Sequence, residues 1–217
     1  MIDISKLDKR ILHFYSVAFP SFFRLVRNEL RDCNSVLDLG CGPDSPLIYS
    51  GWAGAFAIGV DIFPKSIVEA RQKGFYRGCI LADLRSPPFR EAKIVDACLA
   101  RSVLEHLPKE DSLGLLERME NWAMRRVIVV VPNGYCLQEP YDENPFQAHR
   151  SSWTPRDLEN RGYRTYGLGG YKPLRGQRGF PRFRPPLVWL FVSQLTQLMT
   201  HYRPDVAFEL GAVKRLD

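Results

Sequence analysis

The chain has 217 residues, of which 45% are hydrophobic and 25% are charged, and its formal net charge is +6. This composition fits one globular domain that is large enough to bury a core. No stretch reaches the roughly 18 to 20 apolar residues that a membrane-spanning helix needs, which excludes an integral membrane protein.

Helices and strands are expected to alternate through the first two thirds of the chain. Apolar residues recur at helical spacing over residues 8 to 31, where Pro20 is expected to kink or divide the helix. The apolar runs predict strands at 35–40, 55–63, 79–84, 94–100 and 125–134, the last of which is stopped by Pro132. Helices are predicted at 65–74 and 109–123, and a weaker one at 46–53.

The last third of the chain is less regular. Thr154 and Asp157 form a capping-box pattern that predicts a short helix, and residues 163–168 read as a sixth strand. The stretch from 169 to 186, rich in Gly, Pro, Arg and aromatic residues, is expected to be a loop. A helix is predicted at about 186–202 and a final strand within 205–216.

Continuous apolar strands that alternate with helices are typical of a parallel sheet covered on both faces, a doubly wound α/β fold. In such sheets ligands bind beyond the carboxyl ends of the strands. The candidate site residues are therefore those that directly follow each strand, and three of them are acids: Asp38, Asp61 and Asp83.

The first strand ends in a glycine turn that follows Asp38. Gly40 and Gly42 allow a tight turn and a close approach by a ligand. A dinucleotide-binding turn would have a third glycine at position 45, where this chain has Ser45. Because an acid beside the turn would repel a phosphate, we expect a ligand that carries positive charge.

These motifs resemble a class I S-adenosylmethionine-dependent methyltransferase, in particular the type-11 group. The resemblance rests on "VLDLGCG", followed by "GVD", "LAD" and "VLEHLPKED" at successive strand ends, and covers about residues 33 to 135. It implies a Rossmann-like sheet of seven strands with the last one antiparallel, and S-adenosylmethionine as cofactor.

The resemblance also implies roles for individual residues. Asp38 and the Gly40 backbone would lie near the methionine ammonium, Gly42 would admit the cofactor, and Asp61 would accept hydrogen bonds from the ribose hydroxyls. Asp83 would accept from the adenine amino group. The remaining expected cofactor contacts are Cys41, Ile62, the Leu84 backbone, Arg101 and Ser102. The alternative is that the three acids only cap turns or helices.

Position 44 departs from the family pattern, which often has a small residue there. Asp44 adopts a positive φ less easily than glycine does. We therefore expect the cofactor loop to have its own shape, with an affinity that could be lowered.

His106 and His149 are the candidate catalytic bases. Glu105 and His106 resemble the metal-binding Glu-His pair of the ubiquinone-pathway O-methyltransferases, but Ser102 stands where that pattern has a further Glu. The metal site is thus incomplete, and we expect no metal. Packing roles for both histidines remain open, and Trp153 is expected to be a hydrophobic anchor.

Positive charge is concentrated late in the chain. Residues 150 to 186 hold nine Lys or Arg against two acids, so that the rest of the chain is about neutral. Within residues 171–184, aromatic side chains alternate with basic ones, a pattern that suits RNA, an anionic membrane surface or a lid over the acceptor. A solvated basic face is the simpler interpretation.

The helix at 186–202 has an apolar face and a polar face. The apolar face holds Leu187, Leu190, Phe191, Leu195, Leu198 and Tyr202, and the opposite face holds Ser193, Gln197 and Thr200. Beside a basic loop, such a helix fits an interfacial element. The simpler expectation is that it packs on the sheet.

The sequence thus predicts one methyltransferase domain with a helical segment at 1–31, a cofactor core at 33–135 and an acceptor or lid region at 136–217. The expected acceptor is a small molecule or a lipid- or glycan-linked group, methylated on oxygen or nitrogen. An RNA methyltransferase and a non-catalytic cofactor-binding protein are the alternatives. Five scattered cysteines and an N-terminus without signal-peptide features fit a cytoplasmic protein, either free or peripheral to a membrane.

Overall fold

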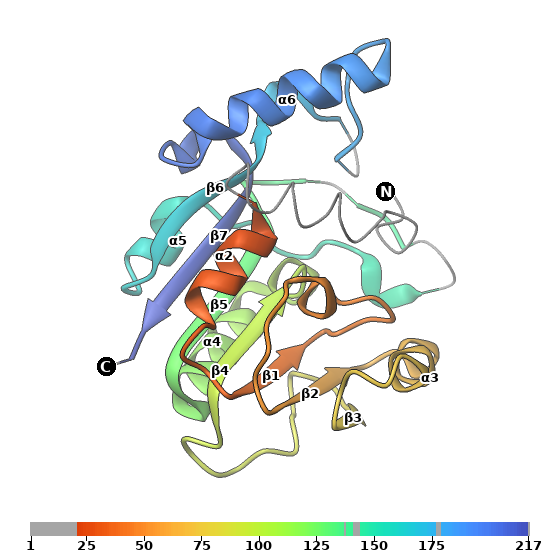
Figure 1. Cartoon of the computed structure of the whole chain (residues 1–217), viewed down its shortest axis with the longest axis vertical. Coiled ribbons are helices and arrows are strands. Elements are labelled where there is room, and N and C mark those ends of the chain that lie inside the picture. The colour runs from red at the N-terminus through yellow and green to blue at the C-terminus, as the bar shows by residue number, and fades with distance from the viewer. Residues whose placement is uncertain (1–20, 137, 141–143, 177–178, 217) are drawn as a thin grey trace.

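The computed structural model describes residues 21–136, 138–140, 144–176 and 179–216. Its centre is one seven-stranded sheet in the order β3-β2-β1-β4-β5-β7-β6 (Figure 1). The strands are β1 (Ser35–Leu39), β2 (Phe56–Asp61), β3 (Gly78–Leu81), β4 (Val95–Arg101), β5 (Ala123–Pro132), β6 (Arg164–Tyr171) and β7 (Ala207–Arg215).

The first five strands are parallel, whereas β7 lies antiparallel to both β5 and β6. The predicted α/β fold, with seven strands and the last antiparallel, is therefore confirmed. The change of strand order from β1 to β4 marks the switch point, beyond whose carboxyl ends ligands bind in such sheets.

Helices cover both faces of the sheet, as the continuous apolar strands required (Figure 1). Leu37 and Leu39 of β1 pack on one face with α4 (Lys109–Trp122), through Leu116 and other buried residues of that helix. Val36 packs on the opposite face with α2 (Phe22–Glu29). The two-residue period of the strand sends neighbouring side chains to opposite cores.

The remaining helices differ from the predicted bounds by a few residues. They are α3 (Pro64–Gln72), α5 (Pro155–Glu159) and α6 (Pro186–Thr200), and Pro46–Tyr49 forms a short 3-10 helix. The capping box of Thr154 and Asp157 is present at the start of α5. Of the helix predicted at 8–31, only α2 lies within the described residues.

Two expectations for the C-terminal third need correction. The stretch at 169–186 is not all loop: β6 continues to Tyr171, and a 3-10 helix follows at Lys172–Leu174. Gly169 and Gly170 have φ of +75° and +78°, and they allow the strand to pass an irregularity in its pairing with β7 and continue.

The helix α6 packs on the sheet, but through its polar face. Its buried residues are Ser193, Gln197 and Thr200, while Leu187 and Phe191 are 80% and 60% exposed. The physical reason is that β6 presents backbone groups at its glycines: Gln197 Nε2 donates to the Gly167 carbonyl, and Gln197 Oε1 accepts from the Gly170 amide, both at 2.7 Å. A buried backbone polar group needs such a partner.

Candidate functional site

The glycine turn after β1 is closed on one side and open on the other. Gly40 and Gly42 have φ of +68° and +56°, in the left-handed region that favours glycine. A Cβ added at Gly40 would lie 2.3 Å from Cγ2 of Val103, whereas one added at Gly42 would meet nothing within 4 Å. Gly40 is therefore required for packing, and Gly42 faces the open space that a ligand needs.

Asp38 is buried beneath this turn, with 2% of its surface exposed. Its Oδ2 accepts hydrogen bonds from the hydroxyls of Ser45 and Tyr76, both at 2.6 Å. Burial raises the pKa of Asp38 from its ordinary 3.8 to about 6, although the two hydrogen bonds oppose the shift. A carboxylate held in this way would be stabilised by a nearby cation.

Tyr76 is a site residue that sequence reasoning missed. It lies between α3 and β3, and its hydroxyl reaches Asp38 across 38 positions of the chain. Its only signal in the sequence is an aromatic residue shortly before a strand, which is too common to single it out.

Asp61 joins the ends of β1 and β2. Its Oδ2 accepts from the Gly42 amide at 2.9 Å, and its Oδ1 accepts from the Phe63 amide at 2.8 Å. Burial raises its pKa. The Ile62 amide also donates to this carboxylate. Because a carboxylate can accept about four hydrogen bonds, capacity remains for a further donor.

Asp83, after β3, is held by its neighbour Arg85. The Arg85 guanidinium donates from Nε and Nη2 to the two carboxylate oxygens, with 2.6 Å as the shortest distance, and lowers the pKa of Asp83. The Leu84 side chain is buried in the core, so only its backbone is left for a ligand. A ligand amino group would have to share Asp83 with Arg85.

Asp44 is not strained. Among the described non-glycine residues, positive φ is found at Lys93 and Ser102, and not at Asp44. The Asp44 carboxylate accepts from the Tyr49 hydroxyl at 2.5 Å and pairs with Lys73 at 2.6 Å. The expected difficulty with positive φ therefore does not arise, and Asp44 ties the loop to the end of α3 instead.

The end of β4 carries Arg101 and Ser102. The Arg101 guanidinium lies over the Phe22 ring of α2, 4.8 Å from its centroid. Ser102 is exposed and has a φ of +52°, a conformation that costs a non-glycine residue energy and clusters at functional sites. The contacts of both residues with a cofactor remain predictions.

The turn after β4 brings together three residues from two parts of the chain. Glu105 and His106 lie in the 3-10 helix Leu104–His106, and the His149 ring lies 4.9 Å from the His106 ring. Burial lowers the pKa of His106 to about 4, and it also lowers the pKa of His149. Both imidazoles are therefore neutral near pH 7.

Trp153 and Asn133, near the end of β5, have structural roles. Trp153 is fully buried and Lys109 Nζ lies 3.4 Å from the centre of its ring, as expected of an anchor. Asn133 Nδ2 donates to the carbonyls of Pro204, Asp205 and Ala207, which fixes the end of β5 to the segment before β7.

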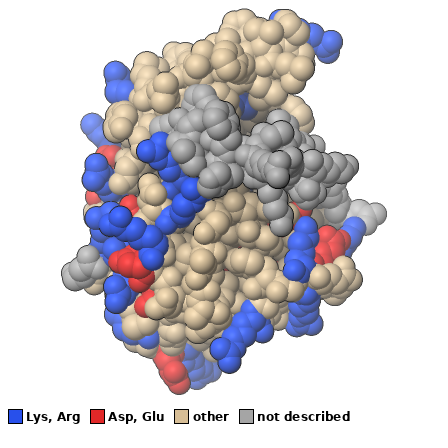
Figure 2. All heavy atoms as spheres, viewed as in Figure 1, with Lys and Arg blue, Asp and Glu red and all other residues tan. Residues whose placement is uncertain are grey.

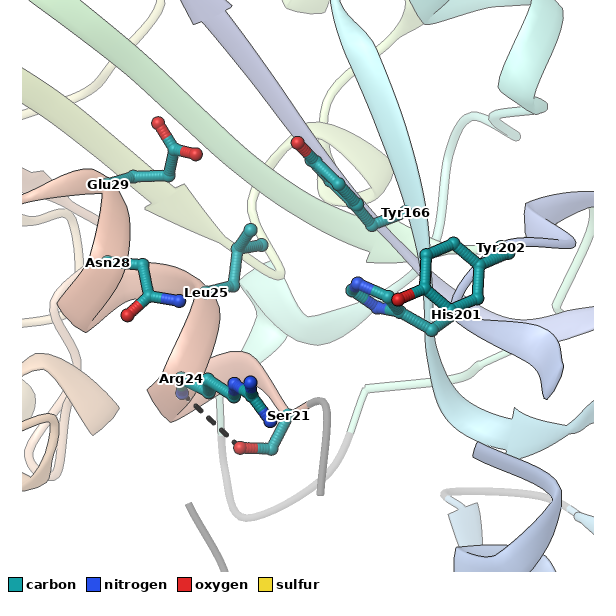
Figure 3. A pocket seen from close by; sticks show the side chains of 8 residues that line it. All are labelled: Ser21, Arg24, Leu25, Asn28, Glu29, Tyr166, His201 and Tyr202. Atoms are coloured by element: carbon teal, nitrogen blue, oxygen red, sulfur yellow. Dashed lines mark hydrogen bonds between the residues drawn. The ribbon is translucent and has the colours of Figure 1, made fainter. Parts of the chain in front are cut away.

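Two hollows in the described surface lie away from the strand-end acids. One, of about 200 Å³, lies between α2 and the β6–α6 region and is lined by Ser21, Arg24, Leu25, Asn28, Glu29, Tyr166, His201 and Tyr202 (Figure 3). The other, of about 490 Å³, is lined by Tyr171, Lys172, Pro173, Arg175, Arg182, Asp205 and Val206. Neither hollow is lined by a residue of the glycine turn.

Comparison with known proteins adds a family to this geometry. Residues 37–131 match a family model described as "Methyltransferase domain". Trans-aconitate 2-methyltransferase of Escherichia coli O9:H4 (strain HS) is 33% identical over 100 residues, 45% of this chain and 39% of that protein. The same enzyme of Azoarcus sp. (strain BH72) is 35% identical over 91 residues, 41% of this chain and 35% of that protein. The chain thus spans less than two fifths of the length of these curated relatives.

Solved structures share the fold at low identity. The plantazolicin methyltransferase BpumL, in complex with a pentazolic desmethylPZN analog and SAH, has a TM-score of 0.54 at 20% identity over 98% of this chain and 87% of that one. Magnesium protoporphyrin IX methyltransferase (ChlM) from Synechocystis PCC 6803 with bound SAH has a TM-score of 0.53 at 18% identity over 100% of this chain and 89% of that one.

Proposed function

Because residues 37–131 form a class I methyltransferase domain, we propose that this protein transfers a methyl group from S-adenosylmethionine to an oxygen or nitrogen of a small-molecule acceptor. The observation that carries the proposal is the pairing of Asp61 with the Gly42 amide, which sets an acid with spare acceptor capacity beside the open side of the glycine turn.

The charges at the strand ends suit this cofactor. S-adenosylmethionine has an ammonium, a sulfonium and a ribose diol, and it has no phosphate. Asp38 supplies a buried acid for the ammonium, and Asp61 supplies two oxygens for the diol. A hydrogen bond to a charged group contributes about 1.5 to 3 kcal/mol. Because Asp61 would accept one from each ribose hydroxyl, substitution of Asp61 tests the site more strongly than substitution of Asp38.

Methyl transfer from a sulfonium is an in-line displacement with a good leaving group. Proximity and alignment can lower its barrier by roughly 7 to 11 kcal/mol, and a base is needed only if the acceptor must lose a proton. The low pKa of His106 makes it a weak base at neutral pH. Of the two predicted bases, the less buried His149 is the better candidate.

The acceptor class is supported by the relatives alone. Trans-aconitate and magnesium protoporphyrin IX are the small molecules that their names print. Since these proteins are distant or match over part of their length, they support a small acceptor and do not specify which one.

Calorimetric titration with S-adenosylmethionine and S-adenosylhomocysteine tests the proposal. We expect micromolar binding by the wild type, loss of binding in Asp61→Ala, and unchanged binding in Glu91→Ala, whose acid is exposed. A folded wild type that binds neither compound would refute the proposal and favour a non-catalytic protein. If binding is found, release of S-adenosylhomocysteine is then followed across a panel of carboxylate, hydroxyl and amine acceptors.

A second feature favours an acceptor at a membrane surface. The outward face of α6 is apolar, with Leu187, Phe191 and Leu198 at 80%, 60% and 53% exposure. The helix itself holds no charged residue. At the top of Figure 2 this surface is mostly tan, and Lys and Arg atoms lie at its edges.

The basic residues beside α6 complete an interfacial pattern. Arg182 and Arg184 precede the helix and are exposed. Apolar residues next to arginines are typical of an element that lies in the headgroup region of an anionic bilayer. RNA would instead bind mainly by base stacking on aromatic rings, whereas the exposed apolar residues of α6 are non-aromatic except Phe191. We therefore propose that α6 docks on an anionic membrane and that the acceptor is lipid-linked or lipid-soluble. Among the described residues, no helix is long and apolar enough to span a bilayer.

Vesicle flotation tests this docking. We expect the protein to float with phosphatidylglycerol-containing vesicles and not with pure phosphatidylcholine. Leu187→Ser with Phe191→Ser should abolish flotation, and Arg182→Ser with Arg184→Ser should weaken it and remove its salt dependence. Val68→Ser, an exposed apolar position on α3, is the matched control and should float as the wild type does. Retention on RNA without flotation would contradict the proposal.

A further inference from the structure

Glu105, His106 and His149 form a cluster that the sequence does not bring together. The two segments are fixed to each other by the backbone, because the amides of Arg150 and Ser151 both donate to the Glu105 carbonyl, at 2.7 and 3.1 Å. The Ser151 hydroxyl also donates to the Leu104 carbonyl at 2.8 Å. His149 is thus held beside the turn that follows β4.

The three side chains each offer a donor atom to one common point. These atoms, one from each residue, all lie within 4.8 Å of one another. Some point therefore lies within roughly 2.8 Å of all three atoms, and metal–ligand bonds of about 2.0 to 2.2 Å require only a small further closure. Rotation of the two half-buried histidine rings supplies displacements of that size.

One oxygen of the Glu105 carboxylate has no partner that the fold provides. The residue is 3% exposed, and its carboxylate is hydrogen-bonded to the Ser102 side chain and to its own backbone, but its Oε2 is buried without a hydrogen-bond partner among the described residues. A buried oxygen is costly to leave unpaired, and a bound metal ion would satisfy it.

Each of the two histidines has a backbone carbonyl beside its Nδ1 atom. His106 Nδ1 lies 3.2 Å from the Ala148 carbonyl, and His149 Nδ1 lies 2.6 Å from the Cys136 carbonyl. A carbonyl can only accept, so Nδ1 carries the proton of each neutral ring and Nε2 keeps its lone pair. A backbone carbonyl that fixes the tautomer is the usual outer partner of a metal-bound histidine.

We propose that Glu105, His106 and His149 bind a divalent first-row transition metal ion. Two imidazoles and one carboxylate suit zinc, iron, cobalt or manganese, and they leave coordination positions open for water or for oxygens of an acceptor. This assignment differs from the expectation of no metal in the sequence analysis. That expectation rested on Ser102, which stands where the resembled pattern has its third ligand. The third ligand comes instead from His149, 43 positions after His106.

Metal binding does not depend on the proposed methyl transfer, but the role of the metal does. If the acceptor is methylated on oxygen, an ion at this place would bind that oxygen and favour its deprotonated form. The two histidines would then act as ligands and not as general bases. The location after β4, where the resemblance places the methyl group near Ser102, supports this use.

Cobalt(II) titration of the chelator-treated full-length protein tests the site, because the visible absorption of cobalt reports its coordination. We expect one equivalent to bind with bands typical of a four- or five-coordinate ion, and zinc to displace it. His149→Gln and Glu105→Gln should each weaken binding by roughly tenfold or more. His201→Gln, a half-buried histidine outside the cluster, is the matched control and should bind as the wild type does.

Circular dichroism establishes that each variant is folded, and the Gln substitutions conserve shape at both positions. A folded wild type that takes up no cobalt, or uptake that His149→Gln leaves unchanged, would overturn the proposal. Titration of the same metal-free protein with S-adenosylhomocysteine separates the two proposals. Cofactor binding without cobalt binding refutes only the metal site. Cobalt binding without cofactor binding refutes only the methyltransferase function.

Discussion

Asp38 should make the affinity for S-adenosylmethionine depend on pH. In the free protein, burial raises the pKa of this carboxyl to about 6, so that it is mostly protonated at pH 5 and mostly ionised at pH 7. The cofactor ammonium, placed beside it, favours the ionised form. Binding therefore releases a proton from Asp38 below about pH 6, and that release weakens the observed affinity.

The size of the effect follows from linkage. We take the pKa of Asp38 in the complex to lie well below 5. The observed dissociation constant is then multiplied by 1 + 10^(pKa − pH), where the pKa is that of Asp38 in the free protein. With a pKa of about 6, affinity is roughly elevenfold weaker at pH 5 and about twofold weaker at pH 6 than at pH 7 and above. The affinity must fall as the pH falls, because a carboxyl with a raised pKa has to lose its proton before it can pair with the ammonium.

Calorimetry between about pH 5 and pH 7, in buffers of different ionisation enthalpy, measures both the affinity and the proton release. Asp38→Asn should bind more weakly at pH 7 and lose the pH dependence. Glu91→Ala, which removes an exposed acid, is the control that should keep both the affinity and the slope. A dissociation constant that is the same at pH 5 and pH 7, or a slope that persists in Asp38→Asn, would refute the reasoning.

The other predictions concern the turn, its support and the polar face of α6. Gly42→Ala should weaken cofactor binding and lower the free energy of unfolding by about 1 to 2 kcal/mol because of its positive φ. Gly40→Ala should lower the free energy of unfolding more, because its Cβ has no room. Equal shifts in the thermal unfolding temperature of the two variants would contradict this. Tyr76→Phe should raise the pKa of Asp38 further and move the pH profile of cofactor binding upward; an unmoved profile would show that the hydroxyl does not support the carboxylate. Gln197→Leu should lower the free energy of unfolding in urea by about 1 to 3 kcal/mol, and an unchanged midpoint would indicate that water replaces the amide.

Local patterns predicted the sheet and the residues at its edge. Apolar runs bounded by Gly or Pro specify strands, and alternation with helices specifies a parallel sheet, so that Asp38, Asp61 and Asp83 had to lie at one edge. Each acid could be found because it lies at the carboxyl end of a predicted strand or shortly after it. The partners of these acids could not all be found in the same way, since Tyr76 reaches Asp38 from a separate loop.

Amphipathic pattern also failed to predict which face of α6 is buried. The usual rule assumes that the receiving surface is apolar, but here Gly167 and Gly170 leave the backbone of β6 uncovered. A Cβ at Gly167 would lie 1.9 Å from the Thr200 carbonyl, so the helix backbone approaches the strand closely. The small or polar side chains of Ser193, Gln197 and Thr200 fit between the helix and the strand, and Gln197 hydrogen-bonds to β6. The leucines of α6 therefore face outward.

By itself, then, the sequence determined the order of the elements, the glycine turn and the acids that end the strands, because each depends on residues within a few positions of one another. Tertiary structure decided the partner of Asp38, the outward apolar face of α6 and the meeting of Glu105 with His149. These features depend on contacts between segments tens of residues apart, and such contacts are set by how the helices and loops pack around the completed sheet.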